Sequence, residues 1–150
     1  MELVVADDSV IAACRNLPRR FRCPRLVPSH PARDLEVTVF DGEVPGLELG
    51  WEVPVEGRGS RARNRPARFL HVLHAWGEKY GLPEGGDRVG TRDFGRRRGD
   101  LYLVTGFSMH REHLLFVWEE DGRAYHTSLH VWDDLEAAEA LLARFVAGVE

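Results

Sequence analysis

The hairpin signal between His113 and Trp132 constrains the fold of this chain more than any other feature. The stretch reads HLLFVWEEDGRAYHTSLHVW, in which two runs rich in apolar and branched residues flank an Asp-Gly pair. Asp121-Gly122 is a dipeptide favoured in two-residue type I′ turns, which need a positive φ at both central positions. We therefore expect the two runs to pair as antiparallel strands.

The same turn fixes the register of the pair. Because a two-residue turn leaves one alignment of the strands, Trp118 lies opposite Tyr125, and we expect both on the face toward the core. His113 lies opposite His130 on the other face, with Cβ atoms about 5 Å apart. His126 shares that face, but the rise of about 3.3 Å per strand residue places it too far from His130 for a shared ligand.

A C-terminal helix is predicted to follow the hairpin. Asp133 and Asp134 are residues that favour helix N-caps. Beyond them, apolar residues recur at helical spacing: Leu135, Ala138, Leu142, Phe145 and Val149. A helix with one apolar face packs that face against another element, so we expect it to lie on the sheet.

Segments upstream of the hairpin predict further strands. Residues 35–40, 47–53 and 100–108 alternate or are rich in branched and aromatic residues. The segment Phe69 to Trp76, FLHVLHAW, fits either a strand or the start of a helix, because its apolar residues alternate with histidines and also share a helical face.

These elements predict an α+β fold in one domain spanning residues 1–150. Residues 1–34 form an irregular N-terminal segment with a short helix, 35–132 an antiparallel sheet of about five or six strands, and 133–150 a helix packed on one face. A chain of 150 residues is long enough to bury one core. No apolar run approaches the roughly 20 residues of a membrane-spanning helix.

Cys14 and Cys23 are the chain's two cysteines, and they flank a short stretch containing Pro18. We expect a disulfide, which would stabilise the N-terminal segment by about 2 to 3 kcal/mol. The alternative is two thiols in a reducing cytosol. The first residues lack the basic and apolar regions of a secretory signal, so both a cytosolic protein and an exported protein whose signal lies outside this chain stay open.

Arginine supplies nearly all the positive charge and gathers in two groups. The first comprises Arg58, Arg61, Arg63, Arg65 and Arg68, and the second Arg92, Arg96, Arg97 and Arg98. Arg61, Arg63 and Arg65 are candidates for contact with an acidic ligand or partner. Few aromatic residues stand between these arginines to stack on bases, so we expect a solvated loop and no nucleic-acid binding.

The histidines are the chain's candidate metal ligands. His113 and His130 lie close enough to share a zinc ion, and His110 or Glu112 just upstream would supply a third ligand. The alternative is ordinary histidines on the outer face of a strand, which is the interpretation we favour. Other catalytic signatures are missing from the sequence: Ser108 stands outside a GxSxG motif, and there is no glycine-rich phosphate loop.

The last third of the chain resembles poorly characterised extracytoplasmic bacterial domains. The shared order is a Gly-led strand, a strand ending in Trp, a turn with Gly, a Tyr-containing strand ending in Ser-x-His, and a terminal helix. These positions are Gly99, Trp118, Gly122, Tyr125, Ser128 with His130, and 135–149.

The same order of elements is similar to lipoprotein-carrier-like and sigma-factor-regulatory periplasmic domains. That resemblance implies a curved sheet and export, although the chain lacks a lipobox cysteine. It also implies another strand at 69–76, and for this reason we predict a strand there.

The sequence leaves three functional hypotheses. The first is a noncatalytic secreted or envelope-associated domain that binds a hydrophobic small molecule or a protein partner and needs no cofactor. The second is a zinc-binding protein or metal-dependent hydrolase that uses His113 and His130. The third is a cytoplasmic partner-binding module, immunity-like or phage-encoded, that uses the loop from Arg58 to Arg68.

Overall fold

The computed structural model describes eight ranges of the chain: 2–15, 21–29, 36–40, 46–53, 68–76, 86–104, 113–130 and 134–150. In chain order its elements are β1 Leu3–Val5, α1 Asp8–Arg15, β2 Leu26–Pro28, β3 Glu36–Phe40, β4 Gly46–Val53, β5 Arg68–Trp76, β6 Gly86–Phe94, β7 Arg97–Val104, β8 His113–Glu120, β9 Arg123–His130 and α2 Leu135–Ala147. The predicted antiparallel sheet with a C-terminal helix is confirmed. None of the described helices is long and apolar enough to cross a membrane.

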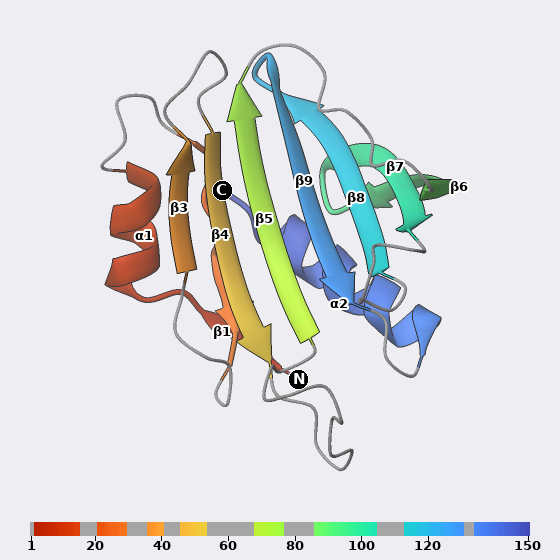
Figure 1. The fold of residues 1–150 in the computed structure, drawn as a ribbon, viewed down its shortest axis with the longest axis horizontal. Helices are drawn as coiled ribbons and strands as arrows, with labels where there is room; N and C mark the ends of the chain where they lie inside the picture. The colour runs from red at the N-terminus through yellow and green to blue at the C-terminus, as the bar shows by residue number, and fades with distance from the viewer. Residues whose placement is uncertain are drawn as a thin grey trace.

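The main sheet has seven strands in the order β3-β4-β5-β9-β8-β7-β6, and its neighbours pair antiparallel. Figure 1 shows α2 behind β8 and β9, with β6 and β7 turned across the end of the sheet. The strands β1 and β2 form a separate two-stranded sheet. The main sheet therefore carries α2 on one face near its β9 and β8 strands.

The β8–β9 hairpin has the register that its turn predicts. Trp118 pairs with Tyr125, and His113 pairs with His130. Asp121 and Gly122 have φ values of 54° and 70°, as a type I′ turn requires. The rings of Trp118 and Tyr125 stack with their centroids 5.3 Å apart, and both side chains are buried. The predicted core face of the hairpin is confirmed.

The segment from Arg68 to Trp76 is a strand, β5, so the helical alternative is wrong. It lies between β4 and β9 and pairs with both along most of its length. A strand at this position supplies backbone partners to both β4 and β9, which a helix could not do because its backbone groups bond to one another.

The strand β6 has no clear signal in the sequence, and it raises the count above the five or six strands expected. Its sequence, GDRVGTRDF, has the glycines and charges of a loop. It forms because its backbone pairs with β7 at the sheet edge, with a register shift between Arg88 and Gly90. Most of its side chains are exposed, so no apolar alternation is needed. Charges and a bulge on an edge strand also discourage pairing with other molecules.

Helix α2 begins and packs as its sequence predicts. The Asp134 side chain caps the first turn by accepting a hydrogen bond from the Glu136 backbone N–H at 2.9 Å. Leu142, Phe145 and Val146 are fully buried in the same cluster as Trp118. The helix ends earlier than 150, because the chain leaves it after Ala147 and residues 148–150 bond to the backbone of residues 23–25.

The N-terminal segment is more regular than the irregular stretch expected. The strands β1 and β2 pair antiparallel, and the helix α1, Asp8–Arg15, lies between them in the chain. The helix cap is Asp7, the residue before the first residue of α1. Asp7 Oδ1 accepts hydrogen bonds from the backbone N–H groups of Ser9 at 3.0 Å and Val10 at 3.3 Å. The capping side chain therefore bonds the first turn in the usual way.

A buried ion pair joins the sheet to both the N-terminal segment and α2. Arg97 Nε donates to Glu120 Oε2 at 2.8 Å, and Arg97 Nη1 donates to the Val146 carbonyl at 3.3 Å. Arg22 Nη2 contacts Asp121 Oδ2 at 2.6 Å, in the β8–β9 turn. Carboxylates flanked by several guanidinium groups form strong charge-assisted hydrogen bonds. This cluster holds the segment around Arg22 against the hairpin.

Candidate functional site

A pocket of about 580 Å³ lies beside the N-terminal segment. Its lining comes from β1, α1, the stretch 21–25 and residue 150: Val5, Ala6, Ile11, Arg15, Phe21, Cys23, Pro24, Arg25 and Glu150. Most of these side chains are apolar, and three carry charge. A concave, mostly apolar site with a few polar groups is the common form of a small-molecule site.

The stretch from Cys23 to Arg25 forms one wall of the pocket and is bonded on both sides. On one side the Ala6 N–H donates to the Arg25 carbonyl at 2.7 Å. On the other, the Cys23 N–H donates to the Glu150 carbonyl at 2.7 Å, and the Glu150 N–H donates back to the Cys23 carbonyl at 2.8 Å. The Arg25 N–H also donates to the Gly148 carbonyl at 2.8 Å. This wall is therefore bonded to two segments that lie far apart in the chain.

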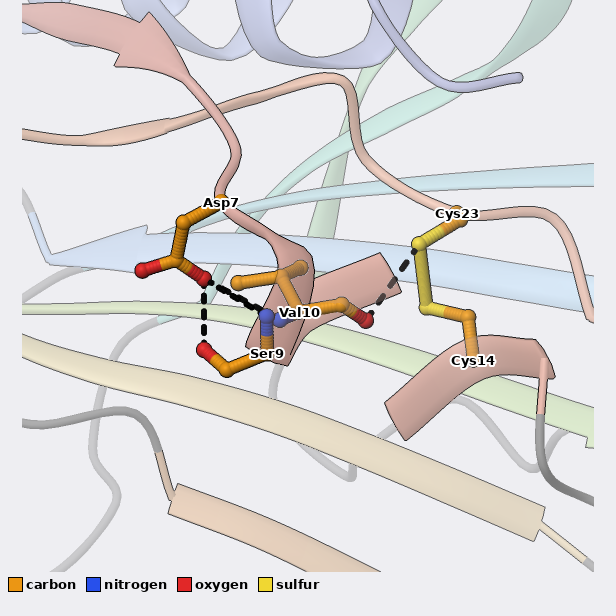
Figure 2. Close-up of a disulfide and its surroundings, with 5 residues drawn as sticks. All are labelled: Asp7, Ser9, Val10, Cys14 and Cys23. Atoms are coloured by element: carbon orange, nitrogen blue, oxygen red, sulfur yellow. Dashed lines mark hydrogen bonds between the residues drawn. A yellow bond between two sulfur atoms is a disulfide. The ribbon is translucent and has the colours of Figure 1, made fainter. Parts of the chain in front are cut away.

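The predicted disulfide is confirmed, and it joins α1 to this wall. Cys14 and Cys23 are bonded, with Cα atoms 5.7 Å apart. Figure 2 shows the bond together with the contact of Cys23 Sγ to the Val10 carbonyl oxygen, at 3.7 Å. Cys14 is fully buried in the core, while Cys23 is half-buried and lines the pocket. The disulfide therefore links the core to the pocket wall.

The start of α1 is stabilised by the ionised form of Asp7. The Ser9 hydroxyl donates to the Asp7 carboxylate, which also accepts the backbone bonds of Val10 and Ser9 (Figure 2). These bonds, the hydroxyl bond first, hold the pKa of Asp7 below its ordinary value. The helix that supplies Ile11 and Arg15 to the pocket is thus capped by a charged group at neutral pH.

The histidines predicted as zinc ligands come together only in part. The Cα atoms of His113 and His130 pair across β8 and β9, while His110 lies outside the described residues. Across the described ranges, no group of three metal-ligating residues stands close enough to hold an ion. His126 is buried, with 7% of its surface exposed, so the expected partly exposed face is wrong here. The reason is its strand: β9 lies inside the sheet, between β5 and β8.

The two arginine groups have different outcomes. Arg61, Arg63 and Arg65 lie outside the described residues. In the second group each guanidinium has an acidic partner: Arg92 contacts Glu139 at 2.6 Å, Arg98 contacts Asp93 at 3.1 Å, and Arg96 and Arg97 contact Glu120 at 3.7 and 2.8 Å. These four arginines share three carboxylates from the sheet and α2, so most of the charge of that group is balanced locally.

Sequence reasoning missed the pocket because its walls are distant in the chain. Arg25 and Glu150 are 125 residues apart. The available signals were the disulfide, which pointed to the right segment, and the branched residues near it. Val5 is the clearest of these, because it leaves a branched apolar side chain 70% exposed.

Comparison of the chain with family models, with curated proteins and with solved structures gave no match. The function of the chain is therefore inferred from its own geometry.

Proposed function

We propose that this chain is a binding domain of an oxidising, extracytoplasmic compartment, and that it holds a hydrophobic small molecule in the pocket beside the Cys14–Cys23 disulfide. The observation that carries the proposal is the pocket of about 580 Å³, in which apolar side chains stand beside three charged ones. This volume falls in the range of about 300 to 1,000 Å³ that small-molecule sites occupy.

The pocket is built to keep its shape. One wall is held by the disulfide, by a backbone bond to Ala6 and by backbone bonds to residues 148–150. Arg22 adds an ion pair from the neighbouring position to Asp121 in the hairpin turn. A site that is ordered without its ligand loses less conformational entropy on binding, which favours affinity.

The location of the pocket differs from the one we expected. The predicted packing of the C-terminal helix on the sheet made the space between these two elements the first place to look for a ligand. The inner side of α2 is instead packed, since Leu142, Phe145 and Val146 are fully buried against the sheet. The proposal therefore places the ligand beside the N-terminal segment.

The disulfide supports the compartment. Disulfides persist where the redox environment is oxidising and are rare in the cytosol. Thiol titration of natively expressed protein, unfolded without reductant, tests this point. We expect no free thiol. Two free thiols per chain would contradict the proposed compartment.

Binding is tested by NMR titration of the ¹⁵N-labelled protein with 1-decanol, an apolar molecule without charge. We expect amide shifts that cluster at Ala6, Ile11 and Cys23. Val5→Asp places a charge on the apolar wall and should abolish those shifts, because burying an unpaired carboxylate against a hydrocarbon chain is unfavourable.

Val4→Asp is the matched control. Val4 is on the same strand and 44% exposed, but it is not among the residues that line the pocket. It should bind 1-decanol as the wild type does. Shifts that are absent, that cluster elsewhere, or that respond equally to the two substitutions would refute the pocket as the binding site.

A further inference from the structure

One guanidinium group of the pocket has no counterion among the described residues. Arg25 Nη1 lies 3.3 Å from Glu150 Oε1, so these two pocket side chains neutralise one another. Arg15 also lines the pocket, and it forms no ion pair with any residue in the described ranges. Among the described side chains of the lining, Arg15 is therefore the guanidinium left without a carboxylate partner.

Arg15 differs in this respect from the arginines of the sheet and its edge. Arg88, Arg92, Arg97 and Arg98 each lie within 4 Å of a carboxylate. The acidic residues nearest in sequence, Asp7 and Asp8, stand at the other end of α1. Eight helical residues separate the two ends by about 10 Å, which is near the Debye length at physiological ionic strength. Those charges are therefore largely screened from Arg15.

The apolar wall begins next to this guanidinium. Ile11 and Arg15 are four residues apart on α1, so they share one face of the helix, and both line the pocket. Val5 and Phe21 continue the apolar lining. Val5 is the most exposed of these, and a hydrocarbon chain that covered it would remove apolar surface from water.

Arg15 is also held in place by its neighbour. Cys14 precedes it and is bonded to Cys23 in the opposite wall. The last residue of α1 is thus fixed relative to the pocket, although its long side chain remains exposed. A guanidinium presents two parallel donors to a carboxylate, which makes it the suitable cation for a bidentate contact.

We infer that the ligand of this pocket is an apolar monoanion, a hydrocarbon chain ending in a carboxylate, whose head contacts Arg15 and whose tail lies against Val5, Ile11 and Phe21. This inference rests on the proposed function and names its ligand class. One guanidinium without a carboxylate partner suits a ligand with one negative charge. Glu150 at the pocket disfavours a dianion such as a phosphate monoester.

The experiment compares decanoate, 1-decanol and decylammonium at neutral pH and low salt, by calorimetry and by competition in NMR titrations. For the wild type we expect decanoate to bind about 10-fold more tightly than 1-decanol, and decylammonium more weakly than either. Hydrogen bonds to charged groups are worth enough to produce a ratio of this size. Added NaCl should weaken the binding of decanoate but not of 1-decanol, because it screens only the charged contact.

Variants assign the head group to Arg15. Arg15→Gln should bring the decanoate to 1-decanol ratio close to 1, and Arg15→Lys should restore part of it. Arg98→Gln is the matched control, since Arg98 is exposed, paired with Asp93 and outside the pocket lining. It should leave the ratio unchanged. Glu150→Gln should raise decanoate affinity a few-fold by removing a negative neighbour.

The outcomes distinguish a failure of the proposed ligand class from a failure of the proposed binding function. If none of the three probes shifts the pocket amides, both the proposed function and the ligand class are wrong. If 1-decanol binds in the pocket as tightly as decanoate, the binding function stands and the ligand class is refuted. A decanoate preference that survives Arg15→Gln also refutes it, because another group would then hold the carboxylate.

Discussion

Two regions of this molecule are held together by different physical means. In the first region, the hairpin β8–β9 and helix α2 share a continuous apolar interface: Trp118 stacks on both Phe116 and Tyr125, and the inner side chains of α2 are fully buried. The second region is the N-terminal segment, residues 2–15 and 21–29, which buries fewer large side chains. Its Leu3, Val10, Phe21 and Val27 join the same core cluster, and the segment is held in addition by the disulfide, by backbone bonds to residues 148–150 and by the ion pair of Arg22.

The difference matters for binding. Apolar packing fills space, and a filled interface offers a ligand no room. A disulfide, an ion pair or a backbone hydrogen bond fixes the distance between two chain segments without filling the space around it. A cavity can therefore remain between the segments. The pocket is accordingly found in the second region. Substitutions in the two regions should therefore differ in size and in what they affect.

Trp118→Ala should have the largest effect on the first region. Trp118 is 2% exposed and stacks on Tyr125, so its removal leaves a cavity in the apolar interface. We expect a loss of about 3 to 5 kcal/mol in the free energy of unfolding. Chemical denaturation measures it, with the exposed Val89→Ala as control. A loss below about 1 kcal/mol would show that Trp118 does not contribute to the core.

Arg97→Met tests the buried ion pair between β7 and Glu120, the carboxylate that Arg22 of the N-terminal segment also contacts. The Arg97 side chain is 3% exposed and shares Glu120 with Arg22 and Arg96. Breaking a buried pair leaves a partly desolvated carboxylate, so we expect a loss of about 2 to 4 kcal/mol in the free energy of unfolding.

The control for that substitution is Arg98→Met, which removes an exposed pair with Asp93 and should change stability by under about 0.5 kcal/mol. Urea denaturation of both variants gives the comparison. Equal effects would mean that burial of the Arg97 pair is not what stabilises the fold.

Removal of the disulfide should affect the second region selectively. Replacing Cys14 and Cys23 by serine releases a loop that spans 9 positions and should lower stability by about 2 to 3 kcal/mol. Hydrogen exchange should show lost protection at β1 and α1, with the β8–β9 amides little changed. Uniform loss of protection across both regions would contradict the distinction between them.

Protonation of Asp7 should have a smaller, local effect. Hydrogen bonds from Ser9 and Val10 lower the pKa of Asp7, so its contribution is present above the ordinary aspartate pKa of about 3.9 and is lost as the pH falls through the lowered value. The ¹³Cα shifts of Ser9 and Val10 should move toward coil values in that acid range. Asp7→Asn should remove this pH dependence, and its persistence would assign the titration to another group.

His113→Ala should have the smallest effect. His113 is half-buried at the end of β8, on the face away from Trp118. If His113 has no functional role, its replacement by alanine should lower the free energy of unfolding by well under about 1 kcal/mol. Thermal denaturation with and without Zn²⁺ checks this. A wild-type melting temperature that rises with Zn²⁺, and a variant that does not respond, would favour the zinc hypothesis.

The first region could be predicted from sequence because its signals are local. Asp121 and Gly122 specify the turn, the turn specifies the register, and the register places Trp118 against Tyr125. The spacing of Leu142 and Phe145 similarly predicts the buried face of α2. Each of these predictions uses residues within a few positions of one another.

The second region could be predicted only where a local signal existed. The proximity of Cys14 and Cys23 in the sequence indicated the disulfide. The pocket depends on pairing between positions 23–25 and 148–150, for which the sequence has no local pattern. The strand β6 was missed for a related reason, because an edge strand such as Gly86–Phe94 forms through its backbone and needs no apolar alternation.

The pairing of residues 23–25 with residues 148–150 has a consequence for the order of folding. The disulfide closes a short loop, whereas the contact of Arg25 with Glu150 closes one of 125 residues. Closing a long loop sacrifices more chain entropy, and such contacts form after the intervening strands are in place. We therefore expect the disulfide between Cys14 and Cys23 to form early in folding, and the contact of residues 23–25 with residues 148–150 to form late. The pocket needs both contacts, so we expect it to be complete only once the two ends of the chain have come together.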